Sequence, residues 1–140
     1  MNSDREETIK RILNNTRTIA VVGISSSDFR PGYTVPAYMQ TQGYRIIPVN
    51  PFLDERLGEK AHSDLLSIPE PVDLVLLFRR SEEVPPFIDQ AVEIGAKALW
   101  MQLGVIHKAA GEKARKAGLD VVMDRCIAVE HRRLRGAGKV

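Results

Sequence analysis

The sequence predicts an α/β fold: a doubly wound, three-layer, Rossmann-like parallel sheet of five to six strands in a single domain. Five apolar runs rich in β-branched residues recur along the 140 residues, and helical patterns separate most of them. The runs show little alternation between apolar and polar residues, which is typical of strands covered on both faces. They span residues 18–23, 44–49, 72–78, 97–102 and 119–124. Strands that alternate with helices favour parallel pairing with right-handed crossovers.

Four helices are expected around these strands. Their patterns span residues 3–15, 34–42, 85–95 and 108–118. Ser3 and Glu6 form a capping-box pattern at the start of the first helix. The third begins with prolines, which suit a first helical turn, and its apolar face includes Ile88 and Val92. A glycine stands at the end of each of the last three, where it acts as a stop signal.

The second predicted strand contains a proline, Pro48. Proline has no backbone N–H to donate to a ladder, so it is found in edge strands or at breaks in the pairing. We therefore expect this strand to lie beside the first strand at an edge of the sheet, with its last residues loosely held.

Composition and charge limit the classes of function. A net charge of +2 and a pI near 8.8 suit an anionic small molecule, but the clustered basic face of a nucleic-acid binder is missing. Basic residues concentrate only between Arg125 and Lys139, as a solvated terminus or a surface for a ligand or partner. His and Cys residues do not occur in pairs at metal-ligand spacing, so no metal site is predicted.

Cys126 is the only cysteine, which excludes an internal disulfide and indicates a reducing compartment. The amino terminus is polar, and no apolar run approaches the roughly 18 residues of a membrane span. We expect a cytoplasmic protein with no nucleic-acid or membrane partner. It is expected to be a monomer or a weak homo-oligomer, and an unknown protein partner is left open.

Polar loops follow the predicted strands at their carboxyl ends. In doubly wound sheets, ligands bind outside these ends, where the strand order reverses. The candidate residues there are 23–30, Asn50 and Pro51, 78–81, 102–104 and 124–126. The first of these loops runs from a strand into a helix, an arrangement that binds anions through free backbone N–H groups and the helix dipole.

The dinucleotide-binding fingerprint fits the first loop poorly. It needs a second glycine where this chain has Ser25, and an acidic residue where the second strand ends in Asn50 and Pro51. NAD is therefore disfavoured, although an NAD(P)- or other nucleotide-binding regulatory domain stays an alternative. The serine hydroxyls and Arg30 suit a phosphate group, unless these are ordinary loop and cap residues.

Two more arginines, Arg79 and Arg80, follow the third strand at the same edge of the sheet. They are either surface charges paired with Glu82 and Glu83 or part of the binding site. Together with Arg30 they favour a ligand with several phosphates over a neutral ligand.

A small serine hydrolase is a competing interpretation. Ser25 lies in a stretch similar to a nucleophile elbow, and Ser25, Asp124 and His131 occur in the Ser, Asp, His order of α/β-hydrolases. The second glycine of the elbow is replaced by Ser27, however, and no segment supplies an obvious oxyanion loop. The hydrolase interpretation is therefore disfavoured.

Five stretches of the chain, taken in order, resemble the small stand-alone CoA-binding proteins. They are VVGISSSDFRPGYTV, GYRIIPVNP, GEKAHSDLLSIPEPVDLVLLFRRSEEVPP, GAKALWMQLGV and GLDVVMDRCIAVEHRRL. The domain of those proteins is similar to the amino-terminal CoA-binding domain of the succinyl-CoA synthetase α subunit, and the resemblance runs from about Arg11 to Leu134. It implies a CoA-binding Rossmann-like domain over residues 1–134, followed by a C-terminal tail over 135–140.

The resemblance also implies a site for coenzyme A or an acyl-CoA. The phosphates would lie on the turn of Gly23, Ile24, Ser25 and Ser26, beside Arg30. The nucleotide and pantetheine parts would lie near Asn50, Pro51, Phe78, Arg79, Arg80, Val84, Gln102, Leu103 and Gly104. The phosphorylated histidine of the synthetase lies in a second domain that these residues do not match, so binding without catalysis is expected. Cys126, at the same edge, is either an inert core residue or a thiolate, activated by Arg125, that exchanges with the CoA thiol or an oxidised CoA disulfide.

Overall fold

The sheet has five parallel strands, as the sequence predicts. The computed structural model describes residues 2–140, with side chains from residue 4 onward. The strands are β1 (Thr18–Val22), β2 (Arg45–Val49), β5 (Leu74–Leu77), β6 (Ala98–Met101) and β7 (Asp120–Val122). They lie in the order β2-β1-β5-β6-β7, and every neighbouring pair is parallel. The strand order therefore reverses between β1 and β5, which is where ligands bind in doubly wound sheets.

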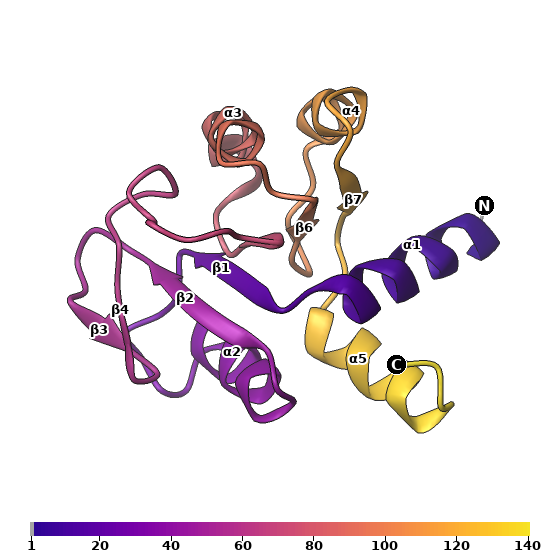
Figure 1. Cartoon of the computed structure of the whole chain (residues 1–140), viewed down its shortest axis with the longest axis horizontal. Helices are drawn as coiled ribbons and strands as arrows, with labels where there is room; N and C mark the ends of the chain where they lie inside the picture. Colours follow the sequence, from indigo (N-terminus) through magenta and orange to yellow (C-terminus); the bar gives the residue numbers. More distant parts are fainter. Residues whose placement is uncertain (1) are drawn as a thin grey trace.

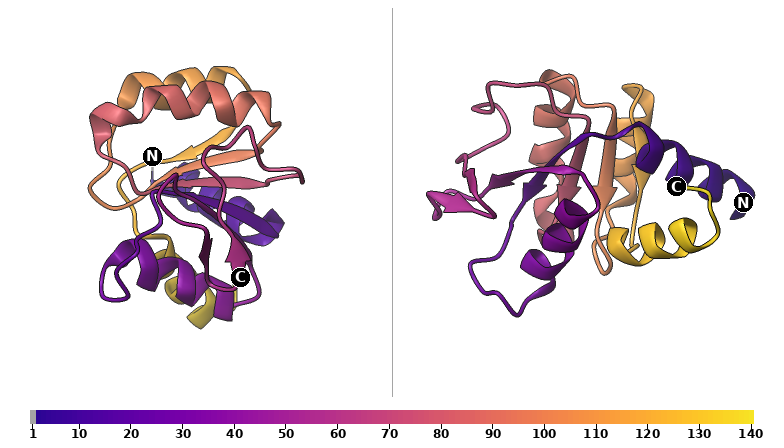
Figure 2. Two further views of the ribbon diagram at one scale, coloured as in Figure 1. Left: turned by 90° about the vertical axis from the view of Figure 1, so that its left-hand side faces the viewer. Right: turned by 60° about the horizontal axis from the view of Figure 1, so that its bottom comes forward.

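Helices cover both faces of the sheet and make three layers (Figure 1, Figure 2). The helices are α1 (Asn2–Asn15), α2 (Pro31–Thr41), α3 (Pro85–Glu93), α4 (Lys108–Lys116) and α5 (Ile127–Gly136). α3 and α4 lie on one face, α2 and α5 lie on the other, and α1 runs beside β7. In the described part of the chain, no helix combines the length and apolarity needed to cross a membrane.

Each strand sends alternate side chains into the two layers. Ala20 and Val22 of β1 join the core under α3 and α4, whereas Ile19 and Val21 join the core with α1, α2 and α5. Burial on both faces explains why the strands read as continuous apolar runs. One detail of the helix prediction is wrong: Val92, expected on the buried face of α3, is 41% exposed.

β2 is an edge strand beside β1, as its proline predicts. Its last residues are not loose, because Val49 pairs with Val22 of β1 and also forms a bridge with His62 on its outer side. The Pro48 carbonyl accepts a hydrogen bond from the His62 N–H at 3.0 Å. The N and C=O of one strand residue point to the same side, so the missing donor of Pro48 also faces outward. The ladder with β1 therefore loses no hydrogen bond.

A short hairpin of β3 (Glu55–Arg56) and β4 (Glu59–Lys60) extends beyond β2 and was not predicted (Figure 1). Its two turn residues, Leu57 and Gly58, have positive φ angles of 55° and 77°. Such turns favour Asn-Gly or Asp-Gly, so a turn with Leu57 at its first position is not recognised from the sequence. Gln40 Nε2 donates to the Leu57 carbonyl at 2.9 Å and ties the hairpin to α2.

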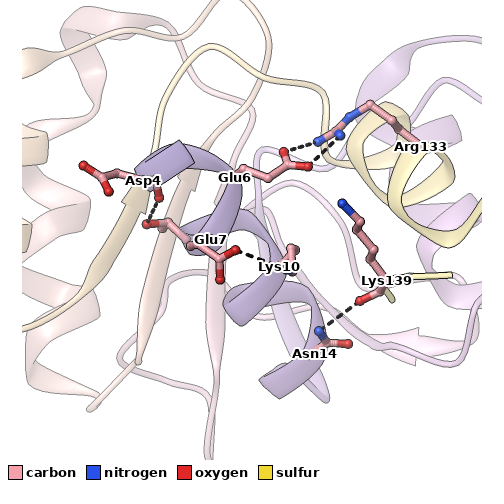
Figure 3. Close-up of polar contacts among 8 residues, drawn as sticks. Asp4, Glu6, Glu7, Lys10, Asn14, Arg133 and Lys139 are labelled. Atoms are coloured by element: carbon pink, nitrogen blue, oxygen red, sulfur yellow. Dashed lines mark hydrogen bonds and ion pairs between the residues drawn. The ribbon is translucent and has the colours of Figure 1, made fainter. Parts of the chain in front are cut away.

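The basic segment near the carboxyl terminus forms α5, a helix that was not among those predicted. Arg133 donates two hydrogen bonds, of 2.9 and 2.7 Å, to Glu6 of α1 (Figure 3). Arg135 donates to Gln42 at 2.6 Å, so this segment is a packed helix and not a solvated terminus. Glu6, the second residue of the predicted capping box, binds Arg133 through its carboxylate. Ser3 lies inside α1, and its side chain is outside the described residues.

Candidate functional site

A small cavity lies at the carboxyl ends of β1 and β2, beside the loop that follows β5. Its volume is about 150 Å³, and it is lined by Val22, Gly23, Val49, Asn50, Pro51, Ser63, Arg79 and Phe87. β1 leads to α2 on one face and β5 leads to α3 on the other, so the two loops separate at this point (Figure 1). Four of the predicted site residues line the cavity. A larger cavity, of about 390 Å³, lies between α1 and β7, away from the strand reversal.

Gly23 brings the ends of three strands together. Its N–H donates to the Val49 carbonyl at 3.0 Å, and its φ angle is +85°. A Cβ atom at this position would lie 2.6 Å from the Phe78 carbonyl oxygen and 3.0 Å from Cδ of Arg79. A side chain would therefore be both strained and sterically blocked, so only glycine lets the loop after β1 approach the loop after β5 this closely.

The turn after Gly23 presents backbone donors. Within the described residues, the N–H groups of Ile24 and Ser26 have no acceptor in the chain. Ile24 is buried as a whole residue, so its N–H is not accessible, whereas Ser26 is exposed and supplies the backbone donor that a ligand can reach. Pro31 is the first residue of α2 and has no N–H. The backbone donors therefore come mainly from the turn and not from the start of α2. The Ser25 hydroxyl oxygen accepts from the Ser27 N–H at 3.0 Å, which leaves its O–H to donate.

Asn50 links the loop after β2 to the turn after β1. Its Nδ2 donates to the Ile24 carbonyl at 2.9 Å, and its Oδ1 accepts from the Phe52 N–H at 2.8 Å. These two bonds use both ends of the amide. Asn50 therefore stabilises the turn, while the adjacent Pro51 lines the cavity.

The arginines near this edge differ in how well they are paired. Arg79 Nη2 donates to Glu83 at 2.9 Å, but its Nε is buried and has no hydrogen-bond partner. Arg80 Nε lies 3.7 Å from Glu83 Oε1, and the Arg80 side chain is 79% exposed. Arg30 caps the start of α2 with its backbone and, among the described residues, forms no ion pair. Glu83, not Glu82, is the carboxylate that pairs with Arg79 and Arg80.

The remaining predicted residues fall into a buried group and an exposed group. Val84 is fully buried, and Gln102 is 5% exposed with its Oε1 accepting from the Ile127 N–H at 3.3 Å. Leu103 is 65% exposed, and Gly104 donates its N–H to Asp124 at 2.8 Å. Phe78 is half-buried against the core. Val84 and Gln102 thus support the loops from inside, whereas Leu103 faces solvent.

Three residues that contribute to this region were missed. Ser63 and Phe87 line the cavity, and Arg56 of the hairpin contacts the turn after β1. Phe87 lies within the helix predicted over residues 85–95, away from the loops expected to bind, and Ser63 lies in an irregular segment. Arg56 lies about thirty positions from its partner Ser25, so no local pattern links the two.

The hydrolase interpretation is not supported by the geometry. Ser25 Oγ accepts from the Ser27 N–H, Asp124 accepts from the Gly104 N–H, and the buried His131 is 2.9 Å from the Tyr38 hydroxyl. The three side chains therefore form no triad. Cys126 is half-buried, precedes α5 and packs against the core. In the described part of the chain, no group of His, Cys, Asp and Glu side chains is placed to hold a metal ion.

Comparison with known proteins identifies the family. A family model described as a CoA binding domain matches residues 17–132. The chain belongs to this CoA-binding domain family. The match confirms the resemblance inferred from the sequence, and it covers the turn after β1, the Asn50 loop and the arginines after β5.

Members of this family occur alone and as parts of larger enzymes. The chain is 42% identical over 131 residues to YneT, an uncharacterized protein of Bacillus subtilis (strain 168), covering 94% of this chain and 97% of YneT. A hypothetical protein from Pyrococcus horikoshii OT3 has a TM-score of 0.89 and 37% identity, covering 94% of this chain and 92% of its own. The alpha subunit of ADP-forming acetate–CoA ligase II of Pyrococcus furiosus is 28% identical over 132 residues, covering 82% of this chain but 28% of the subunit.

Proposed function

We propose that this protein binds coenzyme A, or an acyl-CoA, at the carboxyl edge of β1 and β5 and catalyses no reaction by itself. Its family supports CoA as the ligand class, and the acetate–CoA ligases it matches are named for reactions that use CoA. The position agrees with the general rule that doubly wound sheets bind ligands where the strand order reverses.

The observation that carries the proposal is the buried Nε of Arg79, a charged donor without an acceptor beside the Gly23 turn. A buried donor without a partner costs about 1–3 kcal/mol, so such groups normally have a function or a missing ligand. A phosphate oxygen supplies the acceptor, and hydrogen bonds between an arginine and a phosphate are short and strong.

In this arrangement the pyrophosphate of CoA lies on the turn, held by the free N–H group of the exposed Ser26. Arg30, Arg79 and Arg80 neutralise its charge. The 150 Å³ cavity beside Asn50 and Pro51 takes only part of the ligand, because sites that enclose a drug-sized molecule span about 300–1,000 Å³. The pantetheine arm then leaves over the exposed Leu103 and Gly104.

NAD is the ligand that most needs to be excluded. Dinucleotide-binding folds place an acidic residue at the position of Asn50, where its carboxylate binds a ribose. Asn50 has no carboxylate, and its amide is already hydrogen-bonded to Ile24 and Phe52. The turn also has Ser25 and Asp28 at the positions of the later fingerprint glycines. Both features favour CoA over NAD.

Mass spectrometry of the purified protein under native conditions tests the proposal, since a ligand that copurifies is identified by its mass. Calorimetry then ranks the ligands, and CoA is expected to bind more tightly than dephospho-CoA or NAD. Arg30→Ala and Arg80→Ala should each weaken CoA binding by about 1–3 kcal/mol, through lost charged hydrogen bonds. NAD bound as tightly as CoA would contradict the proposal.

A further inference from the structure

Arg56, in the hairpin beyond β2, makes three contacts with the segment that joins β1 to α2. Its Nε donates to the Ser25 carbonyl at 2.9 Å, and its Nη2 donates to Asp28 at 2.6 Å. Its guanidinium group also lies 4.0 Å from the centre of the Tyr33 ring. The side chain is only 18% exposed, although the hairpin stands at the end of the molecule (Figure 1).

The hairpin that carries Arg56 is itself held in place. Gln40 of α2 donates to the Leu57 carbonyl at 2.9 Å, and just after the hairpin the His62 N–H donates to the Pro48 carbonyl of β2 at 3.0 Å. Arg56 therefore projects from an anchored element toward the turn. Its contacts reach Ser25, Asp28 and Tyr33, which span the whole connection from the turn into α2.

The bond to the Ser25 carbonyl determines how the next peptide group is oriented. No peptide bond of the described residues is cis, and in a trans peptide the C=O and the following N–H point in opposite directions. When Arg56 holds the Ser25 carbonyl on its own side, the Ser26 N–H must point to the opposite side. That N–H is one of the two turn donors without an acceptor among the described residues.

From these contacts we infer that Arg56 is a positioning residue of the phosphate turn. It fixes the Ser25–Ser26 peptide so that the Ser26 N–H faces the ligand, an inference that rests on the proposed CoA site. Arg56 acts through geometry more than through charge, because Asp28 neutralises its guanidinium group. Lysine cannot replace it, since an ammonium group lacks the planar fork that bonds a carbonyl and a carboxylate while stacking on a ring.

The inference is tested with Arg56→Lys, which keeps the charge, and Arg56→Met, which keeps the apolar stem. Arg45→Met is the matched control: it removes the same charge from a residue that also contacts the hairpin, but at the opposite end of β2. By calorimetry, both Arg56 variants should bind CoA about tenfold more weakly than the unaltered chain, and Arg45→Met should bind as the unaltered chain does.

NMR of the Ser26 amide separates positioning from a general loss of stability. In the unaltered chain and in Arg45→Met, saturating CoA should shift the Ser26 amide proton downfield, as a hydrogen bond to phosphate does. In Arg56→Lys at saturating CoA this shift should be much smaller. All of the protein is then bound, so a smaller shift reports a weaker hydrogen bond at the Ser26 N–H and not a lower affinity. If Arg56→Met does not fold, the comparison between Arg56→Lys and Arg45→Met decides.

The outcomes distinguish the role of Arg56 from the proposed CoA-binding function on which it rests. CoA binding and a Ser26 shift that both survive in Arg56→Lys overturn the role of Arg56 and leave the CoA site standing. A failure of the unaltered chain to bind CoA overturns the proposed function, and with it the role of Arg56.

Discussion

The two edges of the central sheet use charge differently. At the amino edge, where the strands begin, charged groups are paired: Arg11 binds Asp120 through two hydrogen bonds of 2.9 and 2.8 Å. Asp73 accepts from the backbone N–H groups of Arg17 and Thr18, both at 3.0 Å, and so caps the start of β1. Arg11, Asp120 and Asp73 thus have partners within the fold, which marks this edge as structural.

At the carboxyl edge the arginines exceed the carboxylates that pair with them. Arg79 and Arg80 share Glu83, the Nε of Arg79 has no partner, and Arg30 forms no ion pair with the described residues. Both edges belong to the same sheet and have the same backbone requirements. Surplus donors, more than charge itself, therefore distinguish the edge at which we propose that the ligand binds.

The largest expected effect comes from Gly23→Ala. Strain at positive φ and the 2.6 Å approach to the Phe78 carbonyl should lower the free energy of unfolding by about 3 kcal/mol and abolish CoA binding. Gly95→Ala is the matched control, because Gly95 also has a positive φ, of +76°, but a Cβ there meets no atom within 4 Å. It should cost about 1 kcal/mol. Equal losses in urea denaturation would show that the close approach at Gly23 is unimportant.

The arginine pair Arg79→Met and Arg11→Met tests the contrast between the edges directly. Arg79→Met should weaken CoA binding by about 2 kcal/mol in calorimetry and raise the free energy of unfolding by about 1 kcal/mol, since it removes the buried donor without a partner. Arg11→Met should do the reverse. It should lower the free energy of unfolding by about 0.5 kcal/mol, since the pair with Asp120 is partly exposed and screened, and leave CoA binding unchanged. Weaker CoA binding in Arg11→Met would contradict the division between the edges.

We expect acid to lower the stability of the fold, because His131 and Glu6, two groups with structural contacts, have lowered pKa values. Burial, with a smaller effect of Arg135, lowers the pKa of His131 below its ordinary 6.5. The unfolded chain then binds this proton more readily than the native state, so stability is complete above about pH 6.5 and declines below it. Arg133 lowers the pKa of Glu6, so that contribution declines only below 4.5.

Thermal melting between about pH 7.5 and 5.5 checks this prediction, in the window where histidines titrate. The melting temperature of the unaltered chain should fall over this interval, and that of His131→Gln should fall less. An equal fall in both proteins would assign the acid sensitivity to other groups.

The smallest effect is expected from removing residues 135–140. These residues include the end of α5. Arg135 donates to Gln42 at 2.6 Å, and the Lys139 carbonyl accepts from Asn14 of α1 at 3.3 Å (Figure 3). Both contacts are remote from the carboxyl edge. Residues 1–134 should therefore fold and bind CoA as the full chain does, with a loss of at most about 1 kcal/mol in stability. Loss of cooperative melting in the shortened chain would refute this.

The sequence predicted the parts of this protein that depend on local pattern. The strands follow from continuous apolar runs, because burial on both faces of a sheet demands them, and the edge position of β2 follows from the missing N–H of Pro48. The same reasoning indicated the turn at Gly23 and the arginines after β5, since residues that follow parallel strands meet at one edge. The family resemblance then suggested the ligand.

Tertiary structure alone decided which of these groups are free to bind. The sequence does not show that Asn50 is occupied by Ile24 or that Val84 and Gln102 are buried, because hydrogen bonds and packing depend on neighbours distant in the chain. It also hid α5, whose arginines are stabilised by partners such as Glu6 more than a hundred positions away. Arg56 reaches Ser25 only because β2 and the hairpin fold beside the turn. The sequence thus determined where the proposed site lies, and long-range contacts determined which donors remain available there.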